Sequence, residues 1–301
     1  MSMTEQRDLI GYGQNPPHPK WPDDARIALN FVINYEEGAE RTPLLGDSHS
    51  ETYGGEFPLT PKPEGMRNLS MESLFEYGSR AGIWRLFRLF KKHKLPVTVF
   101  ATGLALKLNP AVGEYCAKHG HEVAGHGWRW IDYANMPIDE ERQHIQQTIG
   151  IIRETTGTSP VGWYTGRRST NTRPLLLEVG GFLYDSESYA DDLPYTITMN
   201  DKDHLVIPYT LDCNDFRYVT TPGFSHSNDF FDHLKNAFDH LYEEGKTTPK
   251  LMTVGLHPRI SGRPARAAAL NRFLDYAQSV QNVWICRRDE IARHWAIINA
   301  P

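Results

Sequence analysis

The sequence is poor in four features, and each shortage excludes a class of protein. It has three cysteines, an odd number far apart in the chain, so a disulfide framework is excluded and buried free thiols are expected. Its formal net charge of −5 gives no basic face for nucleic acid or an anionic membrane. It has no apolar run near the roughly 18–20 residues that cross a bilayer, and its start, MSMTEQRDLIGYG, lacks the pattern of a secretory signal. We therefore expect a cytoplasmic protein that binds neither nucleic acid nor membrane.

The composition is that of a folded globular chain. Of its 301 residues, 40% are hydrophobic and 23% are charged, as in ordinary soluble domains. This length suits one large α/β domain or two smaller ones, and no change of composition divides the chain. We predict a single domain over residues 26–301, preceded by an extended, proline-rich arm over residues 1–25.

Short apolar runs bounded by glycine, proline or charged residues recur along the chain and are typical of strands. They span residues 26–36, 97–103, 121–127, 161–166, 182–187, 205–211, 251–258 and 283–288. Helical periodicity occupies residues 70–93, 139–154, 230–244 and 265–280 between them. We expect Ser70 to cap the first of these helices and Gly157 to follow the second. The alternation predicts an α/β fold, a distorted (β/α) barrel of about seven to eight mostly parallel strands.

One connection is long for a compact domain. Residues 38–69 form a stretch of about 30 residues with little periodic structure. Such a stretch is a lid, a binding loop or a disordered segment. Because it follows a strand end that carries acids, a loop that shapes a site is favoured over disorder.

Polar side chains follow five of the expected strands, in NYEEG (34–38), GHGWRW (125–130), YTGRRS (164–169), LDCNDF (211–216) and LHPR (256–259). In a parallel barrel, working residues gather at these carboxyl ends. The resulting candidates are Glu36, Glu37, His126, Trp130, Arg167, Arg168, Asp212, Asp215 and His257. A carboxylate base and a histidine acid are what hydrolysis of an amide-type bond needs, because one activates water and the other protonates the leaving nitrogen.

Each candidate also has a purely structural interpretation. Adjacent glutamates at a strand end are often a solvated turn, and a lone histidine after a strand is often a satisfied core residue. His257 could turn the chain before Pro258, and the arginines could pair with surface acids, which contributes little. The convergence of five strand ends on one mouth favours function over these alternatives.

Four of these strand ends resemble motifs of the polysaccharide deacetylase superfamily, and the resemblance extends over roughly residues 26–290. Its first motif, commonly T-F-D-D-G, resembles NYEEG, and its second, H-[ST]-x-x-H, resembles HGWRW at 126–130. The fourth motif's Asp-Trp pair resembles Asp215-Phe216, and the fifth motif's Leu-His resembles Leu256-His257. The resemblance implies a distorted (β/α) barrel in which the first motif supplies a base and a metal ligand and both histidines of the second bind metal.

The chain departs from the metal-binding form of this pattern. Glutamates replace the paired aspartates, Tyr164 stands where the third motif aligns its arginine, and Trp130, whose indole has no lone pair to give, replaces the second histidine. Catalytic zinc usually has three protein ligands plus a water. His121 is a poor substitute, since a separation of five residues from His126 places the two on opposite faces of a strand. We therefore assign no metal ligands and no cofactor.

These departures are similar to the metal-independent allantoinase branch of the superfamily. Four further stretches fit that branch: residues 7–22, 34–40, 70–86 and 125–133. The resemblance implies hydrolysis of the hydantoin ring amide of (S)-allantoin to allantoate, by a homotetramer.

Under this hypothesis Glu36 is the base, His257 protonates the departing nitrogen, and Asp215 orients His257 or bonds ring nitrogens. Trp130 offers a flat wall to the ring. Backbone N–H groups or an arginine could stabilise the oxyanion, and Arg167 and Arg168 are the candidate arginines. The residues expected to contact substrate are Glu37, His126, Trp130, Tyr164, Arg167 and Arg168.

Two other functions stay open. One is a metal-dependent amino-sugar N-deacetylase whose missing ligand comes from elsewhere, with His49, His226 and His233 available. The other is a non-catalytic binding protein on a decayed deacetylase barrel. Retention of Glu36, His126, Asp215 and His257 favours altered chemistry over lost chemistry.

Overall fold

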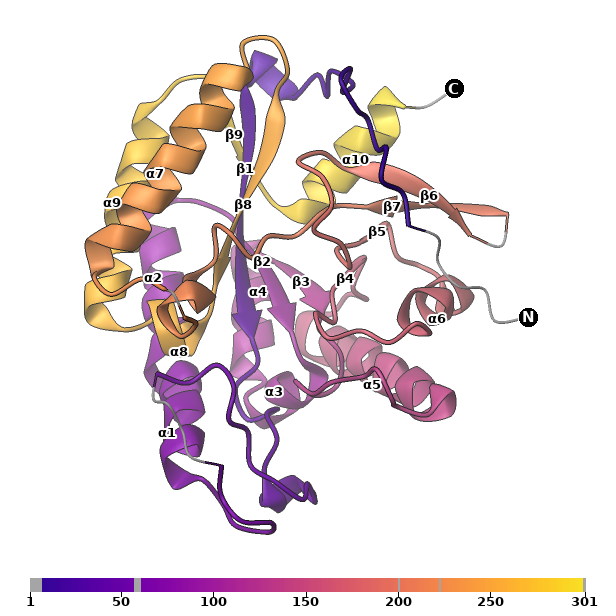
Figure 1. The fold of residues 1–301 in the computed structure, drawn as a ribbon, viewed down its shortest axis with the longest axis vertical. Helices are drawn as coiled ribbons and strands as arrows, with labels where there is room; N and C mark the ends of the chain where they lie inside the picture. Colours follow the sequence, from indigo (N-terminus) through magenta and orange to yellow (C-terminus); the bar gives the residue numbers. More distant parts are fainter. Residues whose placement is uncertain (1–6, 57–60, 200, 222, 300–301) are drawn as a thin grey trace.

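The fold is built on one curled sheet, seen in a computed structural model that describes residues 7–56, 61–199, 201–221 and 223–299 (Figure 1). The six arm residues 1–6 and the loop residues 57–60 lie outside these ranges. The strands are β1 (Ile27–Tyr35), β2 (Thr98–Ala101), β3 (Glu122–Gly125), β4 (Gly162–Trp163), β5 (Tyr184–Asp185), β6 (Tyr195–Met199), β7 (Lys202–Val206), β8 (Lys250–Leu256) and β9 (Val283–Cys286).

Helices connect most of the strands. They are α1 (Leu69–Tyr77), α2 (Ile83–His93), α3 (Gly103–Leu108), α4 (Ala111–His119), α5 (Ile138–Thr156), α6 (Thr172–Val179), α7 (Ser227–Glu244), α8 (Pro258–Ser261), α9 (Pro264–Ser279) and α10 (Arg288–Ile298). A π-helical turn, Gly78–Gly82, joins α1 to α2, and short 3-10 turns occupy Pro22–Asp24, Pro43–Leu45 and Asp215–Tyr218.

The sheet order is β6-β7-β5-β4-β3-β2-β1-β8, and β9 also pairs with β1. Every pairing is parallel except the antiparallel hairpin of β6 and β7. β9 pairs with the first half of β1 and β2 with the second half, so β1 adjoins three strands. Within the described ranges, a single isolated bridge, Asn214 to Gly255, joins the stretch after β7 to β8. The expected parallel α/β fold is confirmed, in the form of a curled half-barrel.

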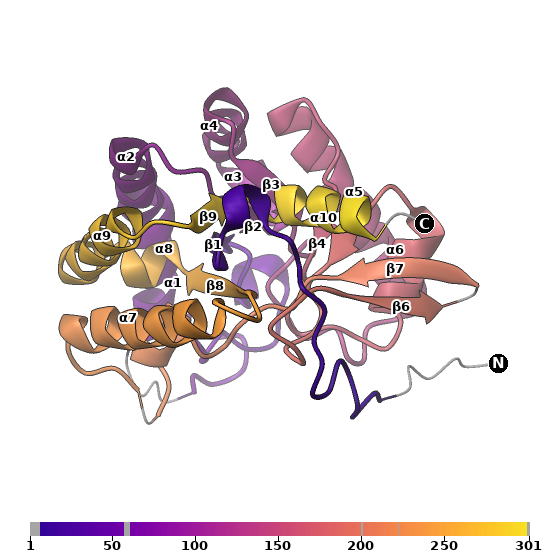
Figure 2. The same cartoon turned by 90° about the horizontal axis from the view of Figure 1, so that it is seen from above.

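The core lies between this sheet and the helices around it. All nine residues of β1 are buried, as expected for a parallel strand covered on both faces. Figure 2 shows α2, α7 and α9 grouped on one side of β1 and β8. Phe31 of β1 contacts Phe90 of α2 and Phe273 of α9, with ring centroids 5.3 and 6.2 Å apart. These contacts fix β1, whose end opens the site, against two helices.

Two local expectations were wrong. The first helix begins at Leu69 and is capped by Asn68, whose side chain accepts from the amide of Met71, and not by Ser70. Of the run expected at 205–211, only residues 205–206 lie in a strand. That strand, β7, begins earlier, at Lys202, because it pairs with β6, which periodicity did not reveal. By contrast Gly157 ends α5 with φ of 81°, as expected.

The arm packs against the sheet. Trp21 is 2% exposed and contacts Trp284 and Trp295 at ring-centroid distances of 5.6 and 6.0 Å. The carbonyl of Pro19 lies 2.8 Å from His294 Nε2 on α10. In Figure 1 the indigo arm accordingly runs beside α10 and the β6–β7 hairpin.

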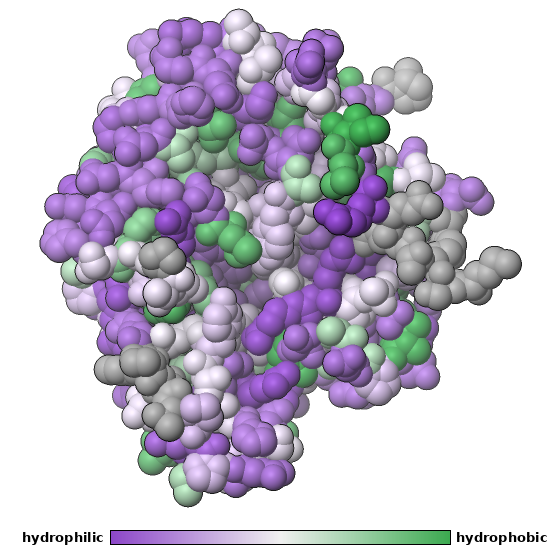
Figure 3. Space-filling model, viewed as in Figure 1, coloured by the Kyte–Doolittle hydropathy of each residue, from purple (hydrophilic) through white to green (hydrophobic). Residues whose placement is uncertain are grey.

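The surface and the thiols agree with the composition. The face in Figure 3 is mostly hydrophilic, with hydrophobic residues in small separate patches. In the described part of the chain no helix is both long and apolar enough to cross a membrane. The three cysteines are buried free thiols, as expected.

Candidate functional site

The parallel register aligns the carboxyl ends of β1 to β4 in one row. Tyr35 pairs with Ala101, Ala101 with Gly125, and Gly125 with Trp163. Backbone hydrogen bonds continue this ladder one residue further along each strand. The residues that follow the strand ends therefore form the first row of the site: Glu36, Thr102, His126 and Tyr164.

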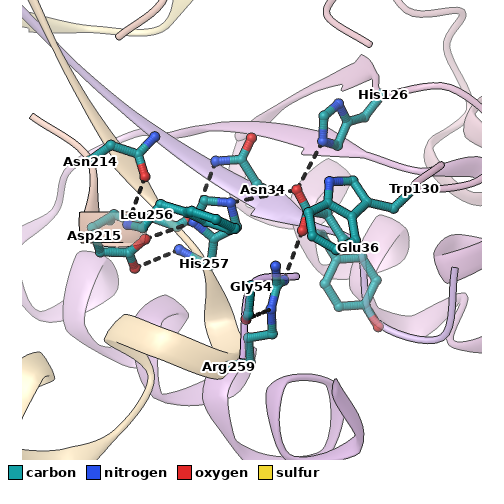
Figure 4. A network of polar contacts seen from close by, with 12 residues as sticks. Asn34, Glu36, Gly54, His126, Trp130, Asn214, Asp215, Leu256, His257 and Arg259 are labelled. Carbon is teal, nitrogen blue, oxygen red and sulfur yellow. Dashed lines mark hydrogen bonds and ion pairs between the residues drawn. The ribbon is translucent and has the colours of Figure 1, made fainter. Parts of the chain in front are cut away.

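Glu36 lies at the centre of the site and is 2% exposed. Its Oε1 is 3.0 Å from Nε2 of His126 and 3.5 Å from Nε2 of His257. Its Oε2 is 2.8 Å from a terminal nitrogen of Arg259. Figure 4 shows these three side chains directed at one carboxylate, with His126 from the end of β3 and both His257 and Arg259 from the turn after β8.

The two adjacent glutamates have opposite pKa shifts. Burial would raise the pKa of Glu36, but the charges of Arg259 and His257 and the hydrogen bond from His126 outweigh burial and hold that pKa well below its ordinary value. Burial raises the pKa of Glu37 to about 7, with Arg259 opposing and the Glu36 charge reinforcing the shift. Glu36 is therefore a carboxylate at neutral pH, while Glu37 titrates near neutrality.

His126 is held at both ring nitrogens. Its Nδ1 donates to the backbone carbonyl of Tyr164, which turns Nε2 toward Glu36. Its ring stacks on the Tyr164 ring, with centroids 5.3 Å apart and planes 8° from parallel. This arrangement fixes the orientation of the ring and holds the Glu36 carboxylate in place.

His257 and Asp215 form a buried pair. Oδ1 of Asp215 is 2.7 Å from Nδ1 of His257, and Oδ2 accepts the backbone amides of His257 and Ser261 at 2.7 and 3.1 Å. Burial would lower the pKa of His257, but the charges of Glu36 and Asp215 raise it to about 9. At neutral pH the ring is therefore protonated, with Nε2 facing Glu36.

Arg259 is the residue that the sequence analysis missed, although it ends the quoted LHPR stretch. It is 3% exposed and lies on α8, two residues after His257. Besides Glu36, it lies 3.9 Å from Oε1 of Glu37, and its Nε donates to the carbonyl of Gly54 at 3.4 Å. The sequence feature that could have indicated Arg259 is its place in the turn after a strand end, and Arg167 and Arg168 share that feature.

Trp130 belongs to an aromatic wall beside these charges. Its ring centroid lies 5.8 Å from that of Phe75, 6.3 Å from Phe216 and 6.4 Å from Tyr53. Tyr53 comes from the long loop, whose residue Ala39 accepts the Trp130 amide at 3.0 Å. The described parts of the loop thus cover the site next to Glu36.

Three further expected site residues follow β4: Tyr164, Arg167 and Arg168. Arg167 donates to the Trp130 carbonyl at 2.9 Å, and its guanidinium lies 4.1 Å from the Trp130 ring centroid. The charge of Arg168 acts on Glu187 and helps to lower that residue's pKa against the effect of burial. Tyr164 contributes its carbonyl and ring to His126, while its hydroxyl bonds that of Tyr189 at 2.7 Å. Arg167 and Tyr164 thus contact Trp130 and His126, which lie around Glu36.

The π-helical turn lets the chain approach the site closely. A Cβ on Gly78 would lie 2.2 Å from Oε1 of Glu37, and one on Gly82 would lie 2.1 Å from the carbonyl oxygen of Pro258. Such contacts are far below van der Waals distance, so both positions require glycine. π-Turns inside helices often mark functional sites.

The donor set does not fit a catalytic zinc ion. His126 offers Nε2, but Trp130 has no lone pair, and the Arg259 cation lies 2.8 Å from Glu36 and 3.9 Å from Glu37. Within the described residues, only Asp212, Cys213 and His233 bring three potential ligand atoms within 4.8 Å of one another. The carboxylate of that group is already paired with a cation, since a nitrogen of Arg217 lies 3.0 Å from Oδ1 of Asp212.

Known proteins resemble this chain over nearly its whole length. The model of the polysaccharide deacetylase family matches residues 67–179. A putative polysaccharide deacetylase of Schizosaccharomyces pombe is 42% identical, with 98% of each chain covered. Two solved structures are also similar: a probable polysaccharide deacetylase from Pseudomonas aeruginosa PAO1, 56% identical with a TM-score of 0.95 over 98% of this chain and 99% of that chain, and Puue allantoinase, 54% identical with a TM-score of 0.96 over 99% of each.

Such identity over the full length, together with the motifs at the strand ends and the curled parallel sheet, places the chain in the polysaccharide deacetylase family.

Proposed function

We propose that the protein hydrolyses the ring amide of allantoin to give allantoate, and that it does so without a metal ion. The observation that carries the proposal is a pair of buried atoms without hydrogen-bond partners among the described residues, Oε1 of Glu37 and Nη2 of Arg259. They lie beside the ion pair of Arg259 Nη1 with Oε2 of Glu36. Buried polar groups nearly always bond something. Adjacent donors and acceptors match a cyclic amide, whose edge alternates carbonyl oxygens and N–H groups. Similarity to Puue allantoinase supports the same substrate.

The proposed reaction uses Glu36 and His257 as base and acid. Water attacks a ring carbonyl carbon while Glu36 accepts its proton. The resulting tetrahedral oxyanion collapses, the carbon–nitrogen bond breaks, and His257 gives the Nε2 proton to the departing nitrogen. The products are the carboxylic group and the N–H of an open chain, and one water is consumed.

The protonation states suit these roles. The His257 pKa of about 9 keeps a proton available on Nε2 at neutral pH, and Asp215, fully buried, holds the other nitrogen. Glu36 is ionised when water must be deprotonated. Glu37 and His126 bind or orient the ring and the attacking water, and the aromatic wall at Trp130 faces the ring.

Metal independence is supported by the side chains that stand where metal ligands would be needed. A zinc ion would compete with the Arg259 cation for the same two carboxylates, and Trp130 cannot complete its coordination.

A direct assay tests the proposal. Purified protein is incubated in parallel with each enantiomer of allantoin, with hydantoin and with an N-acetylated amino-sugar oligomer, and each product is quantified. We expect allantoate from the (S) enantiomer and no released acetate. Acetate release without ring opening would establish a deacetylase and refute the proposal.

A further inference from the structure

Arg259 is a buried cation with unused donors. Its side chain is 2% exposed. Nη1 forms an ion pair with Oε2 of Glu36 at 2.8 Å, whereas Nη2 has no hydrogen-bond partner among the described groups. Leaving buried charged donors unbonded costs several kcal/mol in general. An arrangement this costly is typical of a site whose donors are kept for a ligand.

The aromatic wall fixes the orientation of this guanidinium. Its central carbon lies 4.3 Å from the ring centroid of Phe75, 5.0 Å from that of Trp130 and 5.9 Å from that of Phe216. The carbonyl of Gly54 accepts a hydrogen bond from its Nε, while Nη1 lies on the side of the two glutamates. A charge held among apolar rings acts with little screening by water.

Arg167, one of the two arginines expected from the sequence, is less suited to this task. The side chain of Arg167 is 28% exposed, its terminal nitrogen is used by the Trp130 carbonyl, and it lies 3.9 Å from the carboxylate of Glu51. Its charge is therefore partly solvated and already paired with other groups.

We propose that Arg259 binds the carbonyl oxygen of the substrate and stabilises the oxyanion that forms when water adds, in place of a metal ion. This inference rests on the ring-opening reaction proposed above. As the water oxygen bonds to the carbonyl carbon, the electron pair of the carbonyl moves onto its oxygen, next to the free N–H groups. Arg259 neither gains nor loses a proton, and the pair returns when the carbon–nitrogen bond breaks.

The same movement of charge would strengthen the base. In the free site, Arg259 is one of the charges that hold the pKa of Glu36 low, which makes Glu36 a weak proton acceptor. Once the guanidinium shares its charge with the oxyanion, its hold on Glu36 weakens. The carboxylate then gains proton affinity at the step in which it must accept a proton from water.

The test compares Arg259→Ala and Arg259→Lys with wild type on allantoin, with Arg142→Ala as control. Arg142 is a surface arginine on α5 that pairs with Asp139 and Glu178. Removing one oxyanion donor typically lowers kcat by about 10²–10³, so we expect that loss in Arg259→Ala with a much smaller change in KM. Added guanidinium chloride should restore part of its kcat, whereas equal sodium chloride should not, and Arg142→Ala should match wild type.

The pH profile gives a second readout. Without the Arg259 charge the pKa of Glu36 rises, so the acid limb of kcat/KM should move to higher pH in Arg259→Ala. Should Arg259→Ala fail to fold, Arg259→Lys decides, since it keeps the charge but not the two-pronged donor. It must lose kcat at unchanged KM.

The outcomes separate the two proposals. A wild-type protein that leaves allantoin intact refutes the proposed function and this inference together. If the wild type is active and the Arg259 variants keep their kcat, or show only a raised KM, the inference alone is refuted. A folded Arg259→Ala that guanidinium ion does not rescue and whose pH profile is unmoved also refutes it.

Discussion

At the scale of the residue, the site depends on two neighbouring glutamates in different states. Glu36 contacts His126, His257 and Arg259, whereas Glu37 keeps one oxygen without a hydrogen-bond partner. The two side chains are chemically identical, so only their surroundings in the fold separate the pKa of Glu36 from that of Glu37.

Glu36→Gln should therefore lower kcat by about 10²–10⁴, the usual contribution of a general base. The amide is nearly isosteric but cannot take the proton of water. The matched variant Glu37→Gln should act mainly on KM, because Glu37 is proposed to bind the ring. Steady-state kinetics on both variants, with circular dichroism to verify folding, makes the comparison. Near-normal turnover by Glu36→Gln would remove it from the role of base.

The alkaline limb of activity should report His257. Because Glu36 and Asp215 raise its pKa to about 9 against the effect of burial, kcat/KM should fall as pH rises through about 9 and the proton on Nε2 is lost. The same raised pKa stabilises the fold below the ordinary value of 6.5, and this stability is lost between there and about 9.

Asp215→Asn checks this assignment. Removal of the Asp215 charge should lower the pKa of His257 and move the alkaline limb to lower pH. An alkaline limb at the same pH in the variant would show that another group titrates there.

Most of the candidate residues could be predicted from the sequence, because strand ends in a parallel sheet converge. Glu36, His126, Asp215 and His257 were expected together, and the structure brings them together. Arg259 could not be distinguished from Arg167 and Arg168. Which of three arginines enters a buried charge cluster depends on the direction of each side chain, which a linear pattern does not contain.

At the scale of the element, the π-helical turn sets how closely α1 and α2 approach the glutamates. Gly78→Ala should destabilise the protein by about 1–3 kcal/mol, as overpacking does, and should raise KM by displacing Glu37. Gly150 on α5 provides the control, because a Cβ there meets nothing within 4 Å. Gly150→Ala should stabilise by roughly 0.5–1 kcal/mol without changing activity. Chemical denaturation and kinetics on both variants test this, and equal effects at the two positions would contradict it.

The elements also show where sequence periodicity fails. β1, which is fully buried, and β8, which is buried except at Lys250, were predicted from continuous apolar runs. β6 was missed because its residues alternate between half-buried and exposed and pair only with β7. An edge hairpin of this kind is held by backbone hydrogen bonds, so its side chains leave a weak pattern.

At the scale of the whole molecule, we propose a homotetramer, as the family resemblance implies. The long loop carries large exposed apolar side chains that a subunit contact would bury: Leu44 at 64%, Met66 at 52% and Leu69, at the start of α1, at 64%. Sedimentation equilibrium should give four times the chain mass of 34.4 kDa. A single species at the chain mass would refute the tetramer and leave the site intact.

The whole molecule combines a deacetylase fold with a site whose central cation is an arginine. The curled sheet presents Glu36 and His126 in one row, at the ends of β1 and β3, and the loop after β8 adds His257 and Arg259. Tryptophan at position 130 then closes an aromatic wall where a metal ligand would stand in the metal-binding pattern.

The central claim is tested most directly by allantoin hydrolysis after exhaustive chelation, with metal content determined on the same sample. The account predicts full turnover with far less than one metal ion per chain, and no gain on addition of zinc. Activity that vanishes on chelation and returns with zinc would contradict it, since a metal would then be performing the task assigned to Arg259.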